Sequence, residues 1–301
     1  MKVTKWFKYT VLVSLLIVVA GAVCFFACGG FNLGIDFTGG TMITLKMGKQ
    51  FEVADIQKVL ADNGIEEAPV VKSTDEDGNE IAVVRFKAFE DAEEENAVRA
   101  KMVEDLKAQY PDVDVDNIER VGAIAGADLT RNAVYAILIA CALMLIYIAI
   151  RFQWTFGVSA VIALFHDVLI MIAVVLIVRL QVNSSFIAAI LTIVGYSINN
   201  TIVIFDRIRE NRRRIGSKGD MEAMVNDSVK STLTRSINTS FTTLLTITLL
   251  YILGVDSIRE FALPIIVGLV AGTYSSVFLA APIWFNLQRQ LNKKKAKAAK
   301  A

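Results

Sequence analysis

The chain has 301 residues, 54% of them hydrophobic, and its mean hydropathy is +0.52. Soluble globular domains are about 45 to 50% apolar, so this composition excludes an ordinary water-soluble domain. The 31 basic and 30 acidic side chains nearly cancel, which gives no indication of a nucleic-acid partner.

The charge is divided unevenly along the chain. Residues 31–127 carry 21 acidic and 10 basic side chains, a net charge of −11, and the other residues carry 9 acidic and 21 basic, a net charge of +12. In membrane proteins lysine and arginine collect in the cytoplasmic loops. The division therefore predicts that the acidic block and the basic clusters lie on opposite sides of a membrane.

Six segments are apolar enough to cross a bilayer as helices of about 20 residues. They are Trp6–Cys28, Asn132–Phe152, Phe156–Leu180, Phe186–Phe205, Ile237–Leu253 and Leu263–Leu287, the threonine-rich fifth being the weakest. Basic residues flank the first, second, fourth and sixth segments on one face of a six-span topology. We expect that face, with both termini, to be cytoplasmic, and the chain to be a multi-pass protein of the cell membrane.

The first segment, within residues 1–30, is interpreted as a permanent anchor. Cys28 follows a basic start and an apolar stretch, as a lipoprotein cleavage cysteine would. However, the bulky Phe25 and Phe26 that precede it do not fit the small-residue sites that signal peptidases cut.

Residues 31–128 have the pattern of a small extracytoplasmic α+β domain. Two stretches with helical spacing, which begin near Val53 and Glu90, separate runs with strand-like alternation. The strand-like runs are Thr41–Met47, Ala68–Lys72, Ile81–Lys87 and Val113–Val121. The predicted order is βαββαβ, which is typical of a ferredoxin-like fold.

Two acidic stretches in this domain have simple structural interpretations. Asp75–Asn79 has the composition of a hairpin turn. The acidic residues between Glu90 and Glu95 predict a solvated first turn of the second helix, favoured by the helix dipole. Calcium binding is a poorer interpretation, because the spacing of loop ligands is absent.

Residues 129–206 contain the second to fourth spans, and residues 207–236 form a basic and then amphipathic cytoplasmic segment. In that segment Gly219-Asp220 predicts a helix cap, and Met224, Val225 and Val229 recur on one side of the helix that follows. We expect this helix to lie in the membrane interface before the chain enters the fifth span. Docking of a cytoplasmic partner is the alternative. Residues 237–288 contain the last two spans, and residues 289–301 form a basic cytoplasmic tail.

The sequence has no motif of a soluble enzyme. A phosphate-binding glycine loop and a metal-ligand cluster are both absent, and the chain has a single histidine. We therefore expect no catalytic residue, no metal and no cofactor.

Polar groups inside the spans are the candidates for function, since a charge at mid-membrane costs roughly 2.5 to 3.5 kcal/mol on insertion scales. His166 and Asp167 lie near the middle of the third span, and Arg235 enters the fifth from its cytoplasmic side. The fourth span carries a polar stripe of Thr192, Tyr196, Asn199, Asn200 and Asp206. The stripe could line a hydrated path. Alternatively, the amides and hydroxyls could form interhelical hydrogen bonds that contribute about 0.6 kcal/mol each. Asp206 and Arg235 would then lie among the lipid headgroups.

Several motifs resemble the SecD/SecF family of protein translocase subunits. The heptapeptide GIDFTGG, directly after the first span, is similar to the signature that follows the first helix of SecD and SecF; its signature residues are Gly34, Asp36, Gly39 and Gly40. Asp36 is interpreted as a turn cap rather than an ion ligand. The run GYSINNTIVIFDRIREN at 195–211 closely resembles the fourth helix of SecF, and the motifs around His166-Asp167 and Arg235 also fit. The resemblance covers nearly the whole chain, and its six-span length is similar to SecF alone.

The resemblance implies an accessory subunit of the Sec translocase. It implies a twelve-helix unit with a SecD-like partner, similar to resistance-nodulation-division exporters, which acts beside the SecYEG translocon in the lipid bilayer. The unit would use a proton or sodium gradient to promote export of preprotein substrates. Two other hypotheses stay open: an uncoupled structural scaffold of the translocon, and half of a small-molecule exporter of the same superfamily.

One position departs from the family pattern. Asn200 stands where many SecF proteins have an aspartate, which the resemblance implies to be a proton carrier facing an arginine at the position of Arg235. Asparagine cannot titrate. Three possibilities follow: acids of the partner carry the proton, Asp167 or Asp206 substitutes for the missing acid, or ion coupling is weak. The ion-coupling candidates are Asn200, Arg235, Asp167, Asp206, His166 and Asn199.

Overall fold

The computed structural model describes residues 3–65, 68–74, 78–87, 89, 91–216 and 219–298. The chain divides into two compact units. One is a helix bundle built from Met1–Asn32 and Tyr135–Ala301, and the other is an α/β unit, Leu33–Val134.

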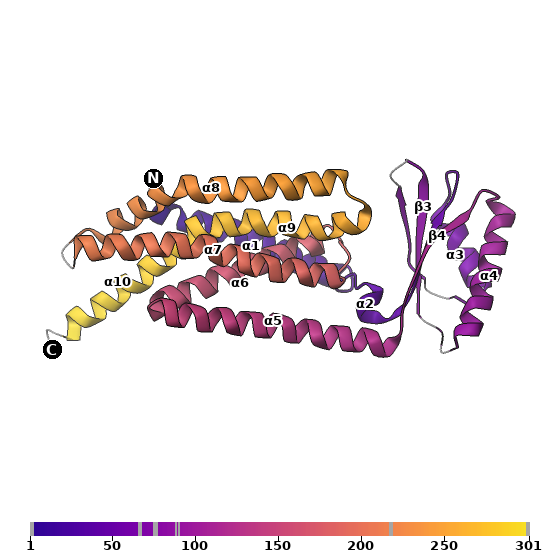
Figure 1. Ribbon diagram of the computed structural model, residues 1–301, viewed down its shortest axis with the longest axis horizontal. Helices are drawn as coiled ribbons and strands as arrows, with labels where there is room; N and C mark the ends of the chain where they lie inside the picture. Colours follow the sequence, from indigo (N-terminus) through magenta and orange to yellow (C-terminus); the bar gives the residue numbers. More distant parts are fainter. Residues whose placement is uncertain are drawn as a thin grey trace. The chain divides into compact units, whose positions relative to one another are not determined.

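Within the described residues, six helices are long and apolar enough to cross a membrane, as predicted. They are α1 (Val3–Ala27), α5 (Ala123–Arg151), α6 (Trp154–Ile177), α7 (Ser184–Ile215), α8 (Met221–Leu253), and a sixth that combines α9 (Asp256–Ser275), the π-helical turn η1 (Ser276–Ala280) and α10 (Ala281–Ala298). Figure 1 shows α1, α6, α7 and α9 running along one another in the bundle. These helices enclose the polar residues described below.

The bundle has an aromatic core at the end where α7 passes into α8. Phe156 and Trp284 are fully buried, and their rings stack with centroids 4.7 Å apart. Phe205 packs against Phe156 with a centroid distance of 5.0 Å. Burying a large aromatic side chain removes much apolar surface from polar surroundings, so this cluster holds the ends of α6, α7 and α10 together.

The predicted interfacial helix before the fifth span is wrong. Asp220 caps a helix as expected, since its carboxylate accepts from the backbone N–H of Glu222 at 2.9 Å. The helix that follows, α8, runs without a break through the fifth span. Its apolar side, with Met224, Val225 and Val229, is buried in the core around Phe205 and Trp284. An amphipathic helix has one apolar face, which can be buried either in a protein core or at a membrane surface. In α8 that face is buried in the protein core.

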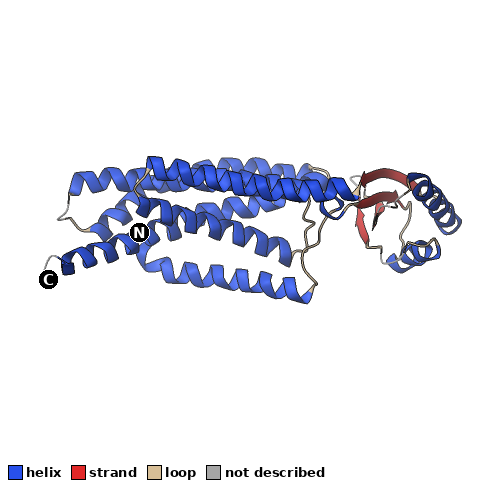
Figure 2. Cartoon of the chain, turned by 90° about the horizontal axis from the view of Figure 1, so that it is seen from below, coloured by secondary structure: helices blue, strands red, loops and turns tan. Residues whose placement is uncertain are grey.

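The α/β unit has the predicted βαββαβ order. It contains a short helix α2 (Ile35–Thr38), then β1 (Gly40–Lys46), α3 (Val53–Asp62), β2 (Val70–Thr74), β3 (Glu80–Phe86), α4 (Ala92–Gln109) and β4 (Asp114–Val121). The strands form one antiparallel sheet in the order β2-β3-β1-β4. Figure 2 shows the strands grouped together, with helices beside them.

The core of this unit lies between the sheet and its two helices. Ile43 and Leu45 of β1 are fully buried, as strand alternation requires for one face of a sheet. Ile56 of α3 and Leu106 of α4 are also fully buried in the same cluster. The predicted hairpin turn at Asp75–Asn79 lies largely outside the described residues.

The signature segment Gly34–Gly40 forms α2 and the start of β1. Gly39 and Gly40 have φ angles of +68° and +134°, and a Cβ on Gly40 would lie 2.5 Å from the carbonyl oxygen of Phe86. Only glycine tolerates both the positive φ and the close approach found at Gly40, so the backbone requires glycine at that position. Asp36 lies inside α2 rather than at its cap, a position that Gly34 holds.

The solvated first turn predicted for α4 is wrong at Glu95. Asp91 caps the helix, and Glu95 is 2% exposed. The Glu95 carboxylate accepts from the Thr41 hydroxyl at 2.6 Å and from the Phe89 N–H at 3.2 Å, and it lies 3.3 Å from Nε of Arg120. These donors offset the cost of burying a carboxylate, so Glu95 ties α4 to β1 and β4.

Tyr110, at the end of α4, predicts an alkaline limit to the stability of the α/β unit. Its hydroxyl donates to Oδ2 of Asp55 at 2.8 Å. Burial, and then the neighbouring Asp55 carboxylate, raise the pKa of Tyr110 above its ordinary value of 10.0. The free energy of unfolding should therefore be highest below about pH 10 and should fall as the pH rises through the raised pKa.

We expect Tyr110→Phe to remove that alkaline fall, and to lower the free energy of unfolding near neutral pH by about 0.5 to 1.5 kcal/mol through loss of the hydrogen bond. Thermal unfolding followed by circular dichroism, between about pH 8 and about pH 11, measures both effects. The prediction would be contradicted if the free energy of unfolding fell equally steeply with pH above about pH 10 in the variant and in the unsubstituted chain.

Candidate functional site

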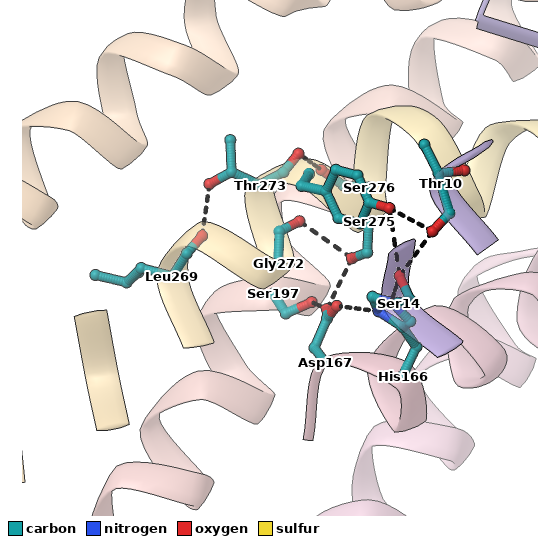
Figure 3. Close-up of polar contacts among 11 residues, drawn as sticks. Thr10, Ser14, His166, Asp167, Ser197, Leu269, Gly272, Thr273, Ser275 and Ser276 are labelled. Atoms are coloured by element: carbon teal, nitrogen blue, oxygen red, sulfur yellow. Dashed lines mark hydrogen bonds and ion pairs between the residues drawn. The ribbon is translucent and has the colours of Figure 1, made fainter. Parts of the chain in front are cut away.

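Asp167 lies near the middle of α6 and is fully buried between helices. Its Oδ2 accepts hydrogen bonds from the hydroxyl of Ser197 on α7 and, at 2.8 Å, from the hydroxyl of Ser275 on α9. Figure 3 shows both serine side chains directed at this carboxyl group. A buried carboxylate in a membrane span needs donors to offset the loss of water, and here two neighbouring helices supply them.

His166 connects the other oxygen of Asp167 to α1. Its Nδ1 lies 2.9 Å from Oδ1 of Asp167, and its Nε2 lies 2.7 Å from the hydroxyl of Ser14 (Figure 3). The Tyr274 hydroxyl lies 3.3 Å from the Ser14 hydroxyl and donates to the carbonyl oxygen of Thr10 at 2.7 Å. Histidine ring nitrogens donate or accept according to their protonation, so this cluster forms a continuous hydrogen-bonded chain from α6 to α1 and α9.

Asn200 belongs to a second polar cluster. It is 3% exposed, and its amide donates to the hydroxyl of Ser240 on α8 at 3.1 Å. Thr273 on α9 donates to the same hydroxyl at 2.7 Å. The described groups of this cluster are amides and hydroxyls, which link α7, α8 and α9 and carry no charge.

The predicted polar stripe of α7 is therefore split between two surroundings. Asn200 faces the interior, whereas Thr192 and Asn199 are exposed on the surface of this chain. Tyr196 lies between them, with its hydroxyl 2.8 Å from both the carbonyl oxygen of Thr239 and the hydroxyl of Thr243 on α8. Arg235 lies just before the predicted fifth span. It is exposed on α8, one helical turn before Thr239.

Asp206 lies near one end of the bundle rather than at its centre. Its Oδ1 is 2.8 Å from Nη2 of Arg209 and 3.6 Å from Nη2 of Arg151. Its side chain is 37% exposed. The structure thus places Asp206 beside arginines of α5 and α7 and keeps it apart from Asp167.

Two glycines of α9 allow the close approach that forms the site. A Cβ on Gly268 would lie 2.5 Å from a side-chain carbon of Ile193, and a Cβ on Gly272 would lie 3.1 Å from Cβ of Ser197. The small residues let the backbones of α7 and α9 approach, as in other membrane helix pairs. The approach brings the hydroxyls of Ser197 and Ser275 within hydrogen-bonding distance of the same oxygen, Oδ2, of Asp167. The π-helical turn η1 begins immediately after Ser275, a feature often found at functional positions of helices.

Sequence reasoning identified His166 and Asp167 but missed their partners Ser14, Tyr274 and Ser275. A serine in an apolar helix commonly bonds to a carbonyl of its own helix, and Ser14 has such an acceptor in Thr10 at 2.9 Å. Spacing offered one signal, because Thr10 and Ser14 lie one turn apart on α1. Within the part of the chain that the structure describes, no group of three or more His, Cys, Asp or Glu side chains could hold a metal ion.

Six apolar helices with polar residues buried between them define a multi-pass membrane protein. Residues 101–290 match the family described as "Protein export membrane protein SecD/SecF, C-terminal", and residues 29–50 match the "SecD/SecF GG Motif". SecF of Sebaldella termitidis is 41% identical over 86% of this chain and 83% of the relative. SecF of Alicyclobacillus acidocaldarius is 36% identical over 100% of this chain and 96% of the relative. The chain belongs to the SecF family of protein translocase subunits.

Solved structures agree. The crystal structure of SecDF from Thermus thermophilus superposes with a TM-score of 0.84 at 37% identity, covering 96% of this chain and 39% of that one. A SecDF crystal structure in a super-membrane-facing form gives a TM-score of 0.70 at 36% identity, covering 100% of this chain and 40% of that one. This chain therefore spans about two fifths of the length of each of these SecDF chains.

Proposed function

We propose that this chain is an accessory subunit of the Sec protein translocase that, with a SecD-like partner, uses the ion-motive force to promote preprotein export. The observation that carries the ion-coupled part is Asp167, a carboxyl group that the fold buries completely between three helices. Relatives named as protein translocase subunits, matched over most of their length, support the role in the translocase. The SecYEG translocon and preprotein substrates are the further partners of this proposal.

The α/β unit is assigned to the extracytoplasmic side and to the ferredoxin-like class. Its element order and its antiparallel strand order β2-β3-β1-β4 support that class. The net charge of −11 over residues 31–127, against basic flanks elsewhere, supports an outer location with both termini in the cytoplasm.

The exposed side of α7 and α8 is assigned to the SecD-like partner. Thr192, Asn199 and Arg235 are exposed there, although they lie in or beside membrane spans. Polar groups facing lipid are costly, so a second protein is a better neighbour for them than acyl chains. The Thermus thermophilus relative, named as SecDF, is much longer than this chain, which covers 39% of it. Its additional length is consistent with a SecD-like half joined to a SecF-like half.

The coupling acid of this chain is assigned to Asp167 with His166. Asn200 holds the position where many relatives are expected to have an aspartate, but its amide is bonded to Ser240 and cannot take up a proton. Asp206 is held in ion pairs at 37% exposure, which suits a structural role at the bundle end. Asn199 and Arg235 are exposed, which suits contact with acids of the partner.

An uncoupled scaffold is the second candidate function. The observation that favours it is the uncharged cluster around Asn200, which joins three helices by hydrogen bonds alone. The scaffold needs neither a titrating carboxyl group nor a gradient. A half-sized small-molecule exporter fits less well, because a single outer unit of Leu33–Val134 is small for that class.

The test of the proposed function is preprotein export in cells that lack this gene. We expect export to fall, and to be restored by the chain together with its SecD-like partner only when the ion gradient is intact. Export is measured as the processed fraction of a pulse-labelled preprotein, with and without a protonophore. Restoration to the same level with the gradient collapsed would favour the scaffold, and normal export without the gene would contradict both functions.

A further inference from the structure

We propose that Ser14, His166 and Asp167 form a proton relay through the α1 side of the bundle, with Tyr274 as its outer member. The inference rests on the proposed ion-coupled function and names the route by which a proton reaches Asp167. It places Ser14 and Tyr274, which no sequence motif indicated, in the coupling machinery. It also separates the route from Asn200, whose amide faces Ser240 on the α8 side.

The distances allow one arrangement of protons in which Asp167 is ionised. Nδ1–H of His166 donates to Oδ1 of Asp167 over 2.9 Å, and the Ser14 hydroxyl donates to Nε2 over 2.7 Å. The Tyr274 hydroxyl donates to the carbonyl oxygen of Thr10 over 2.7 Å. In this state Oδ2 of Asp167 accepts hydrogen bonds from the hydroxyls of Ser197 and Ser275, so both oxygens of the ionised carboxylate have donors.

The same heavy-atom positions allow a second arrangement that holds one more proton. Oδ1–H of Asp167 donates to Nδ1, and Nε2–H donates to the Ser14 oxygen. The Ser14 hydroxyl then turns to the carbonyl oxygen of Thr10, which lies 2.9 Å away. That carbonyl has two lone pairs and can accept from Ser14 and Tyr274 together. Asp167 can thus be charged or neutral without loss of a hydrogen bond along this chain.

The passage between the two states is a balanced transfer of one proton. The Ser14 hydroxyl takes a proton from Tyr274 or from water beside it, and its own proton moves to Nε2. The Nδ1 proton moves to Oδ1 of Asp167, so histidine is neutral before and after the step. Three bonds to hydrogen form and three break, and the Tyr274 oxygen recovers its proton from the solvent side. Histidine suits this role because its two nitrogens exchange donor and acceptor roles near neutral pH.

Burial supports a relay rather than direct access of water to Asp167. Asp167 is fully buried, whereas the His166 side chain is 12% exposed and Tyr274 is half-buried. The groups that contact the pair from neighbouring helices are Ser14 of α1, Ser197 of α7, and Ser275 and the Tyr274 ring of α9. The hydrogen-bonded chain therefore starts at a fully buried carboxyl group, passes through the Ser14 hydroxyl, whose residue is 6% exposed, and ends at the half-buried Tyr274, as a path toward the α1 and α9 side requires.

The experiment uses the chain with its SecD-like partner and translocon in inverted membrane vesicles. It compares Ser14→Ala, Ser14→Thr and His166→Gln, with Ser159→Ala as a matched control. Ser159 is a fully buried serine of the same helix as His166, and its hydroxyl bonds only to Thr155 of that helix among the described contacts. Export is measured with an imposed proton gradient, in water and in deuterium oxide, and again after a protonophore.

We expect Ser14→Ala and His166→Gln to lower gradient-driven export about tenfold or more, a loss typical of a missing proton-transfer group. Ser14→Thr keeps the hydroxyl and should retain most of the rate. Both this variant and the unsubstituted chain should export more slowly in deuterium oxide than in water. Ser159→Ala should behave as the unsubstituted chain, and export after the protonophore should be equal in all four variants.

Two outcomes would overturn the relay while leaving the proposed function intact. In one, Asp167→Asn abolishes gradient-driven export but Ser14→Ala and His166→Gln do not, so protons reach Asp167 by another route. In the other, Ser14→Ala and Ser14→Thr lose gradient-driven export equally, or the Ser14 variants also export less after the protonophore is added. Either result would mean that Ser14 acts through packing and not through proton transfer. If Asp167→Asn itself retains gradient-driven export, Asp167 is not the coupling acid, and the relay fails together with that assignment.

Discussion

Asp167→Asn should reduce preprotein export to the level seen when the ion gradient is collapsed, while the chain stays folded and bound to its partner. Asparagine has nearly the shape of aspartate, and its carbonyl oxygen can still accept from Ser197 or Ser275. It cannot bind or release a proton. The loss should therefore fall on the gradient-dependent part of export, measured at equal protein level with and without a protonophore.

Arg235→Ala is the informative comparison for this variant. Arg235 is exposed on the side assigned to the partner, so its loss should weaken gradient-dependent export through contact with the partner rather than through Asp167. Co-purification of the SecD-like subunit separates the two effects, because Asp167→Asn should leave it unchanged. Unchanged export in both variants would show that the subunit acts as a scaffold.

Gly268→Leu should destabilise the bundle and disable the site together. A Cβ at this position would lie 2.5 Å from Ile193, so the leucine must push α9 away from α7. Overpacking of this kind costs about 1 to 3 kcal/mol in free energy of unfolding. Ser275 lies two turns after Gly268 on α9, so its hydroxyl would move away from Asp167 and lose their hydrogen bond. Gradient-driven export should therefore fall as well. Thermal unfolding in detergent and the vesicle export assay measure the two effects.

Gly195→Ala is the matched control for that prediction. Gly195 is a helix-interior glycine of α7, and a Cβ there meets nothing within 4 Å. Alanine is a better helix former than glycine, so this variant should be unchanged or more stable, by up to about 1 kcal/mol. If Gly268→Leu unfolds at the same temperature as Gly195→Ala, the close packing of α7 and α9 does not stabilise the bundle.

Much of the fold could be predicted because its signals are local. A membrane span is predicted from about 20 consecutive apolar residues, whatever the helix packs against. The strands and helices of Leu33–Val134 follow from periods of two and 3.6 residues in the chain itself. Gly39 and Gly40 were predicted as signature residues from the resemblance of a contiguous motif to the family, although only the structure shows Gly40 against the Phe86 carbonyl.

The errors occurred where a local pattern has two tertiary outcomes. The first turn of α4 is acidic, which favours solvent exposure, yet Thr41 and Arg120 arrive from distant strands and bury Glu95. The amphipathic start of α8 is compatible with a membrane surface or a protein core. Its burial against Phe205 depends on where α7 places that ring.

By itself, the sequence determined the class of this protein, its six spans, its βαββαβ unit and the two ionisable residues in mid-membrane, because hydrophobicity, periodicity and charge are properties of contiguous residues. Only the tertiary structure decided which of those residues form a site. It placed Ser14, Ser197, Ser275 and Tyr274 around His166 and Asp167, and it directed Asn200 to Ser240 instead. The physical reason is that a hydroxyl in an apolar helix can bond to its own helix or to a neighbour, and only the packing of helices selects between them.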